Sequence, residues 1–236
     1  MSTDKQTPLK KTVLVTGAAR RIGRTIALAL AQNGWDVVVH YARSAAEAQA
    51  TVADIIALGQ GAIALQCDLN DEAAVKTLLD RAAAQLGPIS CVVNNASLFD
   101  YDSATDFSTA TLDAHMHTNL VAPILLAQAL HRATPEGAQA VVVNLLDQKL
   151  FNLNPDFLSY TLSKAALQSA TTMLAQALAP KVRVVGVAPG ITLVSGDQSE
   201  AEFQRAHKVT RNVVWCAGAS QRGDFVRTLE LSLIHI

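Results

Sequence analysis

A tyrosine and a lysine lie four residues apart in the segment Ser159-Tyr160-Thr161-Leu162-Ser163-Lys164. On a helix this spacing places both side chains on one face. A neighbouring ammonium group stabilises a phenolate, so we expect Lys164 to lower the pKa of Tyr160 from about 10 toward neutrality. Tyr160 is then suited to exchange a proton with a substrate near neutral pH. A solvent-facing pair without a chemical role is the alternative, because this spacing is common.

A second candidate is the turn Thr16-Gly17-Ala18-Ala19-Arg20-Arg21-Ile22-Gly23, which follows a β-branched run and opens a helical pattern. Backbone N–H groups at such a turn bind a pyrophosphate, and the helix dipole favours its negative charge. Gly23 lets the helix pack close to a sheet. Arg21 stands where a middle glycine is common, and its guanidinium suits both cofactor phosphates and a substrate. An ordinary turn with a solvated arginine is the alternative.

The segment His40-Tyr41-Ala42-Arg43-Ser44 indicates which dinucleotide is bound. Folds that bind NAD place a carboxylate here, for the ribose 2′-hydroxyl. No Asp or Glu lies between Val37 and Ala46. Arg43 instead offers a fork for a phosphate, and Ser44 offers a hydroxyl. We therefore predict NADPH or NADP as the cofactor.

The elements that must position these residues alternate regularly. Apolar runs predict strands at Thr12–Thr16, Asp36–His40, Ala62–Gln66, Cys91–Val93, Ala140–Leu145 and Val182–Val187. Helical patterns cover Arg21–Asn33, Ala45–Leu58, Asp71–Gln85, Thr111–Leu130 (bent near Pro123) and Leu158–Ala179. Because the strands are apolar on both faces, we expect a parallel sheet between two helix layers. This is a doubly wound, Rossmann-like α/β fold.

The composition excludes several classes of protein. The chain has 236 residues, of which 50% are hydrophobic and 17% charged, with a net charge of -1. These values exclude a disordered chain and a nucleic-acid binder that relies on global positive charge. There is no apolar run of membrane-spanning length and no secretory signal at the N-terminus, so we expect neither a nucleic-acid nor a membrane partner.

The cysteines and histidines give two further expectations. Cys67, Cys91 and Cys216 form no CxxC pair, so we expect a reducing cytoplasm and buried packing roles for the first two. His115 and His117 point to different sides of a helix without an evident third ligand. We therefore predict no metal site.

Taken together, these motifs resemble the short-chain dehydrogenase/reductase family over roughly residues 11–210. The resemblance rests on the Thr16–Gly23 turn, Asp68-Leu69, Asn94-Asn95-Ala96-Ser97, Asn119, the Tyr160/Lys164 pair and Pro189-Gly190. It implies that Asp68 and Leu69 contact the adenine, and that Asn95 and Ala96 support the cofactor ribose. It also implies that Lys164 holds the nicotinamide ribose and that Asn119 serves a water relay behind Lys164. Pro189, Gly190 and Thr192 would border the nicotinamide.

One position departs from the common family pattern. Most members carry a serine about 13 residues before the tyrosine, and here that position is Asp147. An ionised carboxylate is a poor partner for a ketone oxygen, but it accepts hydrogen bonds from the amino groups of a heterocycle and delivers a proton once protonated. Asp147 as the cap of a loop is the alternative. With Arg21, Ser97 and Phe99, it resembles the pteridine reductase branch, in which a pterin lies between the nicotinamide and an aromatic ring that Phe99 matches.

We therefore predict an NADPH-dependent reductase of a pterin-like small molecule, such as a dihydropterin or dihydrofolate. Tyr160 supplies a proton, and Asp147 orients the substrate and relays a proton. A general carbonyl reductase of the same family is one alternative. A dinucleotide-binding protein without turnover is another.

The C-terminal segment is the reason to consider a dinucleotide-binding protein without turnover. We divide the chain into a Rossmann-like domain, residues 1–210, and an atypical tail, residues 211–236, which has no clear period. The last six residues read as an in-frame translation of a sequencing adapter, so our hypothesis is a non-native tail. The family closes its sheet with a seventh strand that we do not find here. The family also forms homotetramers, which we expect if the C-terminus is complete.

Overall fold

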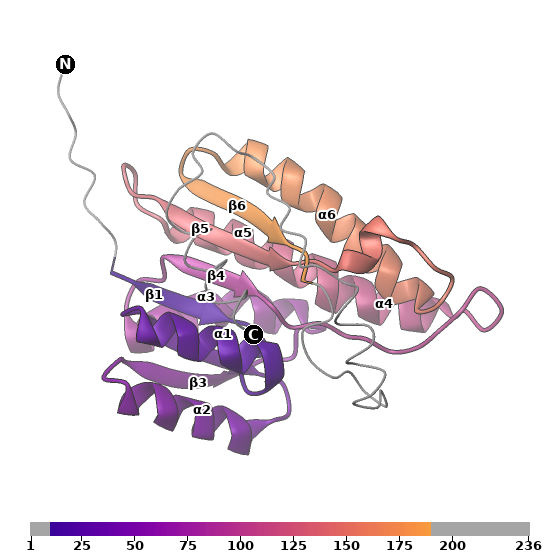
Figure 1. Cartoon of the computed structure of the whole chain (residues 1–236). Coiled ribbons are helices and arrows are strands. Elements are labelled where there is room, and N and C mark those ends of the chain that lie inside the picture. Colours follow the sequence, from indigo (N-terminus) through magenta and orange to yellow (C-terminus); the bar gives the residue numbers. More distant parts are fainter. Residues whose placement is uncertain (1–9, 190–236) are drawn as a thin grey trace.

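The computed structural model describes residues 10–189, which form one parallel sheet with helices on both faces (Figure 1). The strands are β1 (Thr12–Val15), β2 (Asp36–Tyr41), β3 (Ala62–Gln66), β4 (Cys91–Asn94), β5 (Ala140–Leu145) and β6 (Val182–Val187). The helices are α1 (Arg21–Gln32), α2 (Ala45–Ala57), α3 (Glu72–Leu86), α4 (Thr109–Met116), α5 (Ala122–Ala133) and α6 (Leu158–Leu178). A π-helical segment, η1 (His117–Val121), joins α4 to α5, and a 3-10 turn, η2 (Gln148–Phe151), precedes α6.

The predicted fold class is confirmed. The strand order is β3-β2-β1-β4-β5-β6, and every pair is parallel. Each strand lies within one residue of its predicted ends. The predicted tail and the question of a seventh strand lie outside the described residues.

The apolar strands are explained by two cores, one on each face of the sheet. Val13 and Val15 of β1 pack with Ile26 of α1 and Ile55 of α2, whereas Leu14 faces the opposite side. On that side the core includes buried residues of α3, α5 and α6: Val75, Leu78, Leu79, Ala82, Leu126, Ala127, Leu130 and Ala175. Successive side chains of a strand point to opposite faces, so a strand covered on both sides must be apolar throughout.

The long helix predicted over residues 111–130, bent or interrupted near Pro123, is confirmed in outline. The interruption is the π-helical segment η1, which ends two residues before Pro123 and contains Asn119. Pro123 lies in the first turn of α5, directly after η1.

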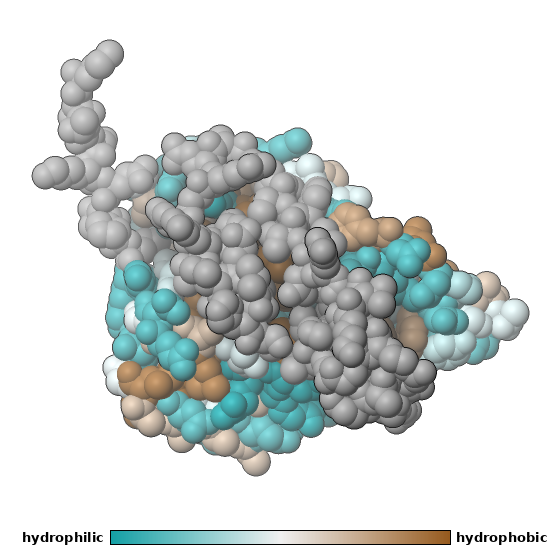
Figure 2. Space-filling view, in the orientation of Figure 1, coloured by the Kyte–Doolittle hydropathy of each residue, from teal (hydrophilic) through white to brown (hydrophobic). Residues whose placement is uncertain are grey.

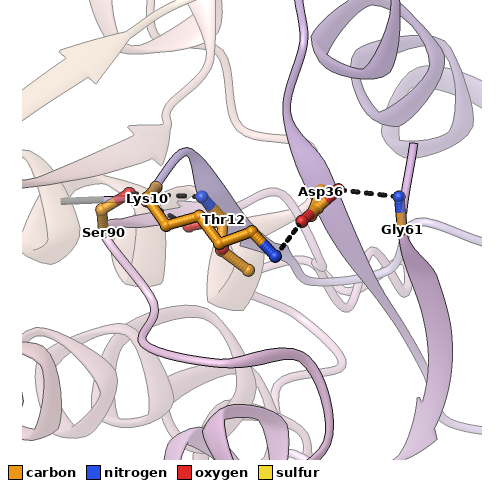
Figure 3. Close-up of polar contacts among 5 residues, drawn as sticks. All are labelled: Lys10, Thr12, Asp36, Gly61 and Ser90. Atoms are coloured by element: carbon orange, nitrogen blue, oxygen red, sulfur yellow. Dashed lines mark hydrogen bonds and ion pairs between the residues drawn. The ribbon is translucent and has the colours of Figure 1, made fainter. Parts of the chain in front are cut away.

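Polar contacts join the amino ends of four adjacent strands, β3, β2, β1 and β4 (Figure 3). This end of the sheet lies opposite the carboxyl ends of the strands. The Lys10 ammonium lies 2.5 Å from Asp36 Oδ2, and the Gly61 N–H donates to Asp36 Oδ1 at 2.7 Å. Although burial raises the pKa of the Asp36 carboxyl, the hydrogen bond from Lys10, the Gly61 N–H and the Lys10 charge together lower it below its ordinary value. Ser90 Oγ donates to the Lys10 carbonyl at 2.8 Å. This end of the sheet is therefore held by charge and hydrogen bonds.

The carboxyl ends of the strands meet at the other edge, toward the right of Figure 1. In a doubly wound sheet, ligands bind at this edge, where the strand order reverses between β1 and β4. Several exposed apolar side chains come from loops at this end: Phe99, Tyr101, Phe151 and Leu153. Figure 2 shows hydrophobic and hydrophilic patches side by side on the described surface there. Among residues 10–189, no helix is long and apolar enough to cross a membrane.

Candidate active site

The turn between β1 and α1 is the tightest packing at the carboxyl edge. Gly17 has a φ of +63°, and a Cβ at Gly23 would lie 2.2 Å from the Gly17 carbonyl oxygen. Only glycine fits the second position, because any side chain there would overlap the backbone. The turn therefore brings the N-terminus of α1 close to the sheet, as predicted from Gly23.

A buried histidine holds this turn in place. The Gly17 N–H donates to His40 Nδ1 at 3.0 Å, and the Ala18 N–H donates to the His40 carbonyl at 2.9 Å. His40 Nε2 lies 3.0 Å from the Cys67 carbonyl, which makes it the protonated nitrogen of a neutral ring. Burial lowers the pKa of His40 to about 4. Sequence reasoning named His40 only as the first residue of the segment at the end of β2, since its partners are 23 and 27 residues away.

Arg21 begins α1 with a φ of +52°, in the left-handed region that L residues seldom adopt. A glycine would adopt this conformation without strain, which explains why glycine is common at this position of the turn. The side chain of Arg21 is exposed at the carboxyl edge. A strained non-glycine residue at the mouth of a site points to a function for its side chain.

The residues predicted to select the dinucleotide lie where β2 ends, and those implied to contact the adenine lie where β3 ends. Tyr41 is half-buried, Arg43 is exposed, and Ser44 precedes the first turn of α2. Asp68 is exposed just after β3, and its Oδ1 accepts from the Asn70 N–H at 3.0 Å, while Leu69 is buried. The structure therefore brings these residues to the same edge as the Gly17 turn.

Asn95 and Ala96 join β4 to the turn after β1. The backbone N–H groups of both residues donate to Thr16 Oγ1 at 3.0 Å. The Asn95 side-chain amide donates to the carbonyls of Thr16 and Gly17, at 2.9 and 3.3 Å. Side-chain hydrogen bonds thus join the ends of β1 and β4, the two strands between which the strand order reverses.

Tyr160 and Asp147 are joined by a short hydrogen bond at this edge. The Tyr160 hydroxyl donates to Asp147 Oδ2 at 2.6 Å, while Asp147 Oδ1 accepts from the Lys149 N–H at 2.7 Å. Asp147 therefore caps η2 and contacts Tyr160 at the same time. Burial first, and then the charge of Asp147 and its hydrogen bond, raise the pKa of Tyr160 well above its ordinary value.

Lys164 does not contact the Tyr160 hydroxyl. Its ammonium group donates to the Leu145 carbonyl at 2.7 Å and lies 5.8 Å from the centroid of the Tyr160 ring. Burial lowers the pKa of Lys164 to about 8, while Asp147 opposes this shift. The prediction that Lys164 lowers the pKa of Tyr160 is therefore wrong for this arrangement, because Asp147 is the nearer charge and favours the protonated phenol.

Asn119 lies behind this pair, in η1. Its amide donates to Ser163 Oγ at 2.9 Å and to the Leu98 carbonyl at 3.0 Å. Its Oδ1 accepts from the Leu98 N–H at 2.8 Å and from Ser97 Oγ at 3.2 Å. Asn119 thus connects α6 to the loop that follows β4.

That loop carries an aromatic cluster next to the reactive pair. The Phe99 ring stacks on the Phe157 ring at 4.2 Å between centroids and meets the Tyr160 ring edge-on at 4.6 Å. Tyr101 packs edge-on against Phe157 at 5.1 Å. Phe99 is still 49% exposed, so part of its ring stays accessible at the carboxyl edge. Sequence reasoning found Phe99 but missed Phe157, which has no local signature.

Of the remaining predicted residues, the structure describes Pro189, which follows the end of β6. Pro189 is half-buried, and its carbonyl accepts from the Gln148 N–H at 3.2 Å. Gly190 and Thr192 lie outside the described residues. Within residues 10–189, no three His, Cys, Asp or Glu side chains come together in a way that could hold a metal ion.

The chain is similar in sequence to short chain dehydrogenases. The family model for short chain dehydrogenases matches residues 11–205. A 3-oxoacyl-[acyl-carrier-protein] reductase of Staphylococcus aureus is 32% identical and covers 82% of this chain and 78% of its own. An uncharacterized oxidoreductase of Methylorubrum extorquens is 34% identical over 187 residues, which are 79% of this chain and 75% of the relative.

Solved structures give a second comparison. FolM alternative dihydrofolate reductase 1 of Brucella canis, crystallised with NADP, is 45% identical with a TM-score of 0.79 and covers 82% of this chain and 77% of its own. A short chain dehydrogenase of Burkholderia cenocepacia, also crystallised with NADP, is 37% identical with a TM-score of 0.75 and covers 84% and 80%.

Proposed function

The chain belongs to the short-chain dehydrogenase/reductase family, and from this premise we propose that it is an NADPH-dependent reductase of a pterin-like heterocycle, such as a dihydropterin or a dihydrofolate. The observation that carries the proposal is the 2.6 Å hydrogen bond from Tyr160 to Asp147. A carboxylate at this point suits the amino and ring N–H groups of a heterocycle better than a ketone oxygen, because an ionised carboxylate only accepts hydrogen bonds. The similarity to FolM supports the same substrate class.

The residues at the carboxyl edge fit a dinucleotide with a 2′-phosphate. The Gly17 turn leaves no room for a Cβ at Gly23, so α1 begins close to the sheet, and a helix N-terminus at this place suits a pyrophosphate. Arg43 is exposed after β2, where no acidic residue lies between positions 37 and 46. We assign the cofactor to one set of residues: Gly17, Arg21, Ile22, Gly23, Tyr41, Arg43, Ser44, Asp68, Leu69, Asn95, Ala96, Ser97, Tyr160, Lys164 and Pro189, together with Gly190 and Thr192.

NADPH, when bound, supplies the hydride for a carbon of a C=N bond. Tyr160 completes the reduction by donating its proton to the ring nitrogen. Burial and Asp147 raise the pKa of Tyr160, which keeps the phenol protonated before it meets the substrate. Asp147 holds the Tyr160 hydroxyl and accepts the amino N–H groups of the substrate. A proton taken up by Asp147 from solvent then returns Tyr160 to its starting state.

Two further features of the site act on the substrate. The open face of Phe99 offers a flat apolar surface against which a heterocycle packs, and Arg21 and Ser97 supply polar contacts at its rim. Lys164 is buried with its ammonium group on the Leu145 carbonyl, which fixes α6 against the end of β5. We assign catalysis to Asp147, Tyr160, Lys164 and Asn119, and substrate binding to Arg21, Ser97, Phe99, Asp147 and Tyr160.

The test is a substrate panel with NADPH and NADH. We expect kcat/KM to be higher for dihydrobiopterin or dihydrofolate than for simple ketones and quinones, and higher with NADPH than with NADH. An Asp147→Ser variant should lose pterin reduction and gain relative activity on ketones, because a hydroxyl polarises a carbonyl oxygen and a carboxylate does not. A wild-type preference for ketones would overturn the pterin assignment.

The second candidate is a carbonyl reductase, favoured by the 32% identity to the 3-oxoacyl reductase of Staphylococcus aureus. The same panel separates the two. In a carbonyl reductase, Asp147 would be a substitution without effect on the reaction, and its replacement by serine would leave ketone turnover unchanged. A location in the cytoplasm and a homotetrameric assembly stay predictions from the sequence. Light scattering tests the assembly.

A further inference from the structure

The catalytic helix α6 is capped by a residue from another loop. The residue before α6 is Phe157, whose φ is +56° and whose side chain has no hydrogen-bond acceptor. The cap comes instead from Asp102, 57 residues before Ser159. Its carboxylate accepts from the Ser159 N–H at 2.9 Å and from the Ser159 hydroxyl, and its carbonyl accepts from the Leu158 N–H at 3.2 Å. Both Asp102 and Ser159 are buried, at 3% and 0% exposed.

This contact favours the helix electrostatically as well as by hydrogen bonding. A carboxylate at a helix N-terminus satisfies N–H groups that have no partner within the helix. It also interacts favourably with the positive end of the helix dipole. Because Tyr160 directly follows Ser159, in the first turn, the position of its hydroxyl depends on this cap.

The same loop carries the aromatic face of the site and is held at two further points. Asn119 bonds the Leu98 N–H and carbonyl, and His115 Nε2 accepts from the Asp100 N–H at 3.2 Å. Between and after these points lie Phe99 and Tyr101, which pack on Phe157. The loop is thus fixed to η1 and α4 at one end and to the start of α6 at Asp102.

We propose that Asp102 is a positioning residue, which sets the first turn of α6 and thereby holds the Tyr160 hydroxyl against Asp147 and beside the Phe99 face. Asp102 does not contact the reacting atoms. It joins the loop that offers the aromatic surface to the helix that delivers the proton. The proposal rests on the proposed role of Tyr160 as a proton donor.

The test compares Asp102→Ala and Asp102→Asn with Leu78→Ala. The asparagine keeps an acceptor for the Ser159 N–H, whereas the alanine removes it. Leu78 is buried in the core at α3, in a cluster whose α6 members, Leu174, Ala175 and Leu178, lie near the C-terminal end of that helix, so its replacement lowers stability without altering the first turn of α6. Measurements are kcat and KM for the pterin, the Kd for NADPH, the melting temperature, and amide hydrogen exchange.

Asp102→Ala should lower kcat by about tenfold or more while the Kd for NADPH stays within about twofold, since small displacements of a proton donor are costly. Asp102→Asn should recover most of kcat. Leu78→Ala should lower the melting temperature but keep kcat within about twofold at temperatures at which it is folded. A kcat for Asp102→Ala no lower than that of Leu78→Ala would overturn the proposal.

Hydrogen exchange makes the outcome independent of the substrate. The amides of residues 158–161 and those of residues 97–103 should both exchange faster in Asp102→Ala, because one side chain joins the two segments. Faster exchange in only one segment would refute the link, whatever the enzyme reduces. Wild-type protein that reduces no pterin would refute the proposed function and leave the exchange result standing.

If Asp102→Ala fails to fold, Ser159→Ala takes its place, since it removes only the hydroxyl that bonds Asp102. We then expect kcat to fall by about threefold or more. A kcat equal to that of the wild type would refute the proposal.

Discussion

His40 makes the stability of this protein depend on pH. The ring is 1% exposed, accepts the Gly17 N–H through Nδ1 and must stay neutral to do so. Burial lowers the pKa of His40 to about 4, and the Arg81 charge adds to this, while the Cys67 carbonyl and Asp68 oppose it. In the unfolded chain the pKa returns to about 6.5.

The sign and size of the effect follow from these two pKa values. Below about pH 6.5 the unfolded chain takes up a proton that the folded chain resists, so the free energy of unfolding falls with falling pH. The loss is complete once the pH has passed the folded-state pKa of about 4. At about 1.4 kcal/mol per pH unit, His40 removes about 2 kcal/mol by pH 5 and about 3 kcal/mol by pH 4.

The assay is urea unfolding, followed by circular dichroism, of wild type and His40→Asn between pH 7.5 and pH 4.5. Asparagine cannot titrate, and its oxygen still accepts the Gly17 N–H. Other groups that titrate in this range are common to both proteins and cancel in the difference. We expect the difference in unfolding free energy to change by about 2 kcal/mol or more over this range.

A second variant tests the link to the cofactor. In His40→Gln the amide reaches toward Cys67 but leaves the Gly17 N–H without its acceptor, so the Kd for NADPH should rise, whereas His40→Asn should keep it. A difference in unfolding free energy that stays constant from pH 7.5 to pH 4.5 would refute the reasoning. Equal NADPH affinity in both variants would show that His40 does not hold the turn.

Three further predictions follow from other contacts. Arg21→Gly should raise the free energy of unfolding by about 1 kcal/mol, measured by thermal shift, because it relieves a φ of +52°. The same variant should weaken NADPH binding about tenfold, measured by fluorescence titration. Unchanged affinity would contradict the role of Arg21. Tyr160→Phe should abolish turnover and keep the Kd for NADPH, and substantial residual activity would remove Tyr160 from the mechanism. Asp36→Asn should lower stability by about 1 kcal/mol above about pH 4, discounted because Lys10 is mostly exposed. This difference should vanish as the pH falls through the lowered pKa of Asp36, and a difference that persists in acid would refute the assignment.

The sequence predicted the sheet well because the signal there is local. A strand such as Val13 to Val15, buried on both faces, has to be apolar at every position, and that pattern is visible in a few letters. The Gly17 turn was equally predictable, since the close approach of α1 to the end of β1 requires glycine at fixed spacing.

Long-range contacts were not visible in the same way. The proline predicts an interruption of the long helix near residue 123, but nothing local predicts that it is the π-helical segment η1, in which Asn119 bonds Leu98 and Ser163, 21 and 44 residues away. The pKa of Tyr160 was predicted from Lys164, its neighbour in sequence, whereas the charge in contact with its hydroxyl is Asp147. This error arose because spacing along a helix says nothing about what packs against it.

Asp147 shows a different limit of sequence reasoning. A loop cap and a substrate-facing carboxylate were treated as alternatives, but one oxygen of Asp147 caps η2 while the other accepts from Tyr160, so the cap does not exclude a role in the site. Asp102 shows a third limit. Nothing around it distinguishes it from a surface aspartate, because the helix that it caps begins more than fifty residues later in the chain.

The two rims of the sheet, at the amino and the carboxyl ends of the strands, differ in what they carry. The predicted site residues that the structure describes lie at the carboxyl rim. The turns at Gly34, Gly59, Gly87 and Gly137 lie at the amino rim, each just before a strand, and a Cβ at any of them would meet nothing within 4 Å. Each of these glycines has a φ between +79° and +94°, where an L side chain is strained, so the glycine itself has to stay. An epitope tag, a dye or a surface tether placed on a residue beside it faces away from the carboxyl edge, and we expect immobilised or labelled forms of this kind to keep their turnover.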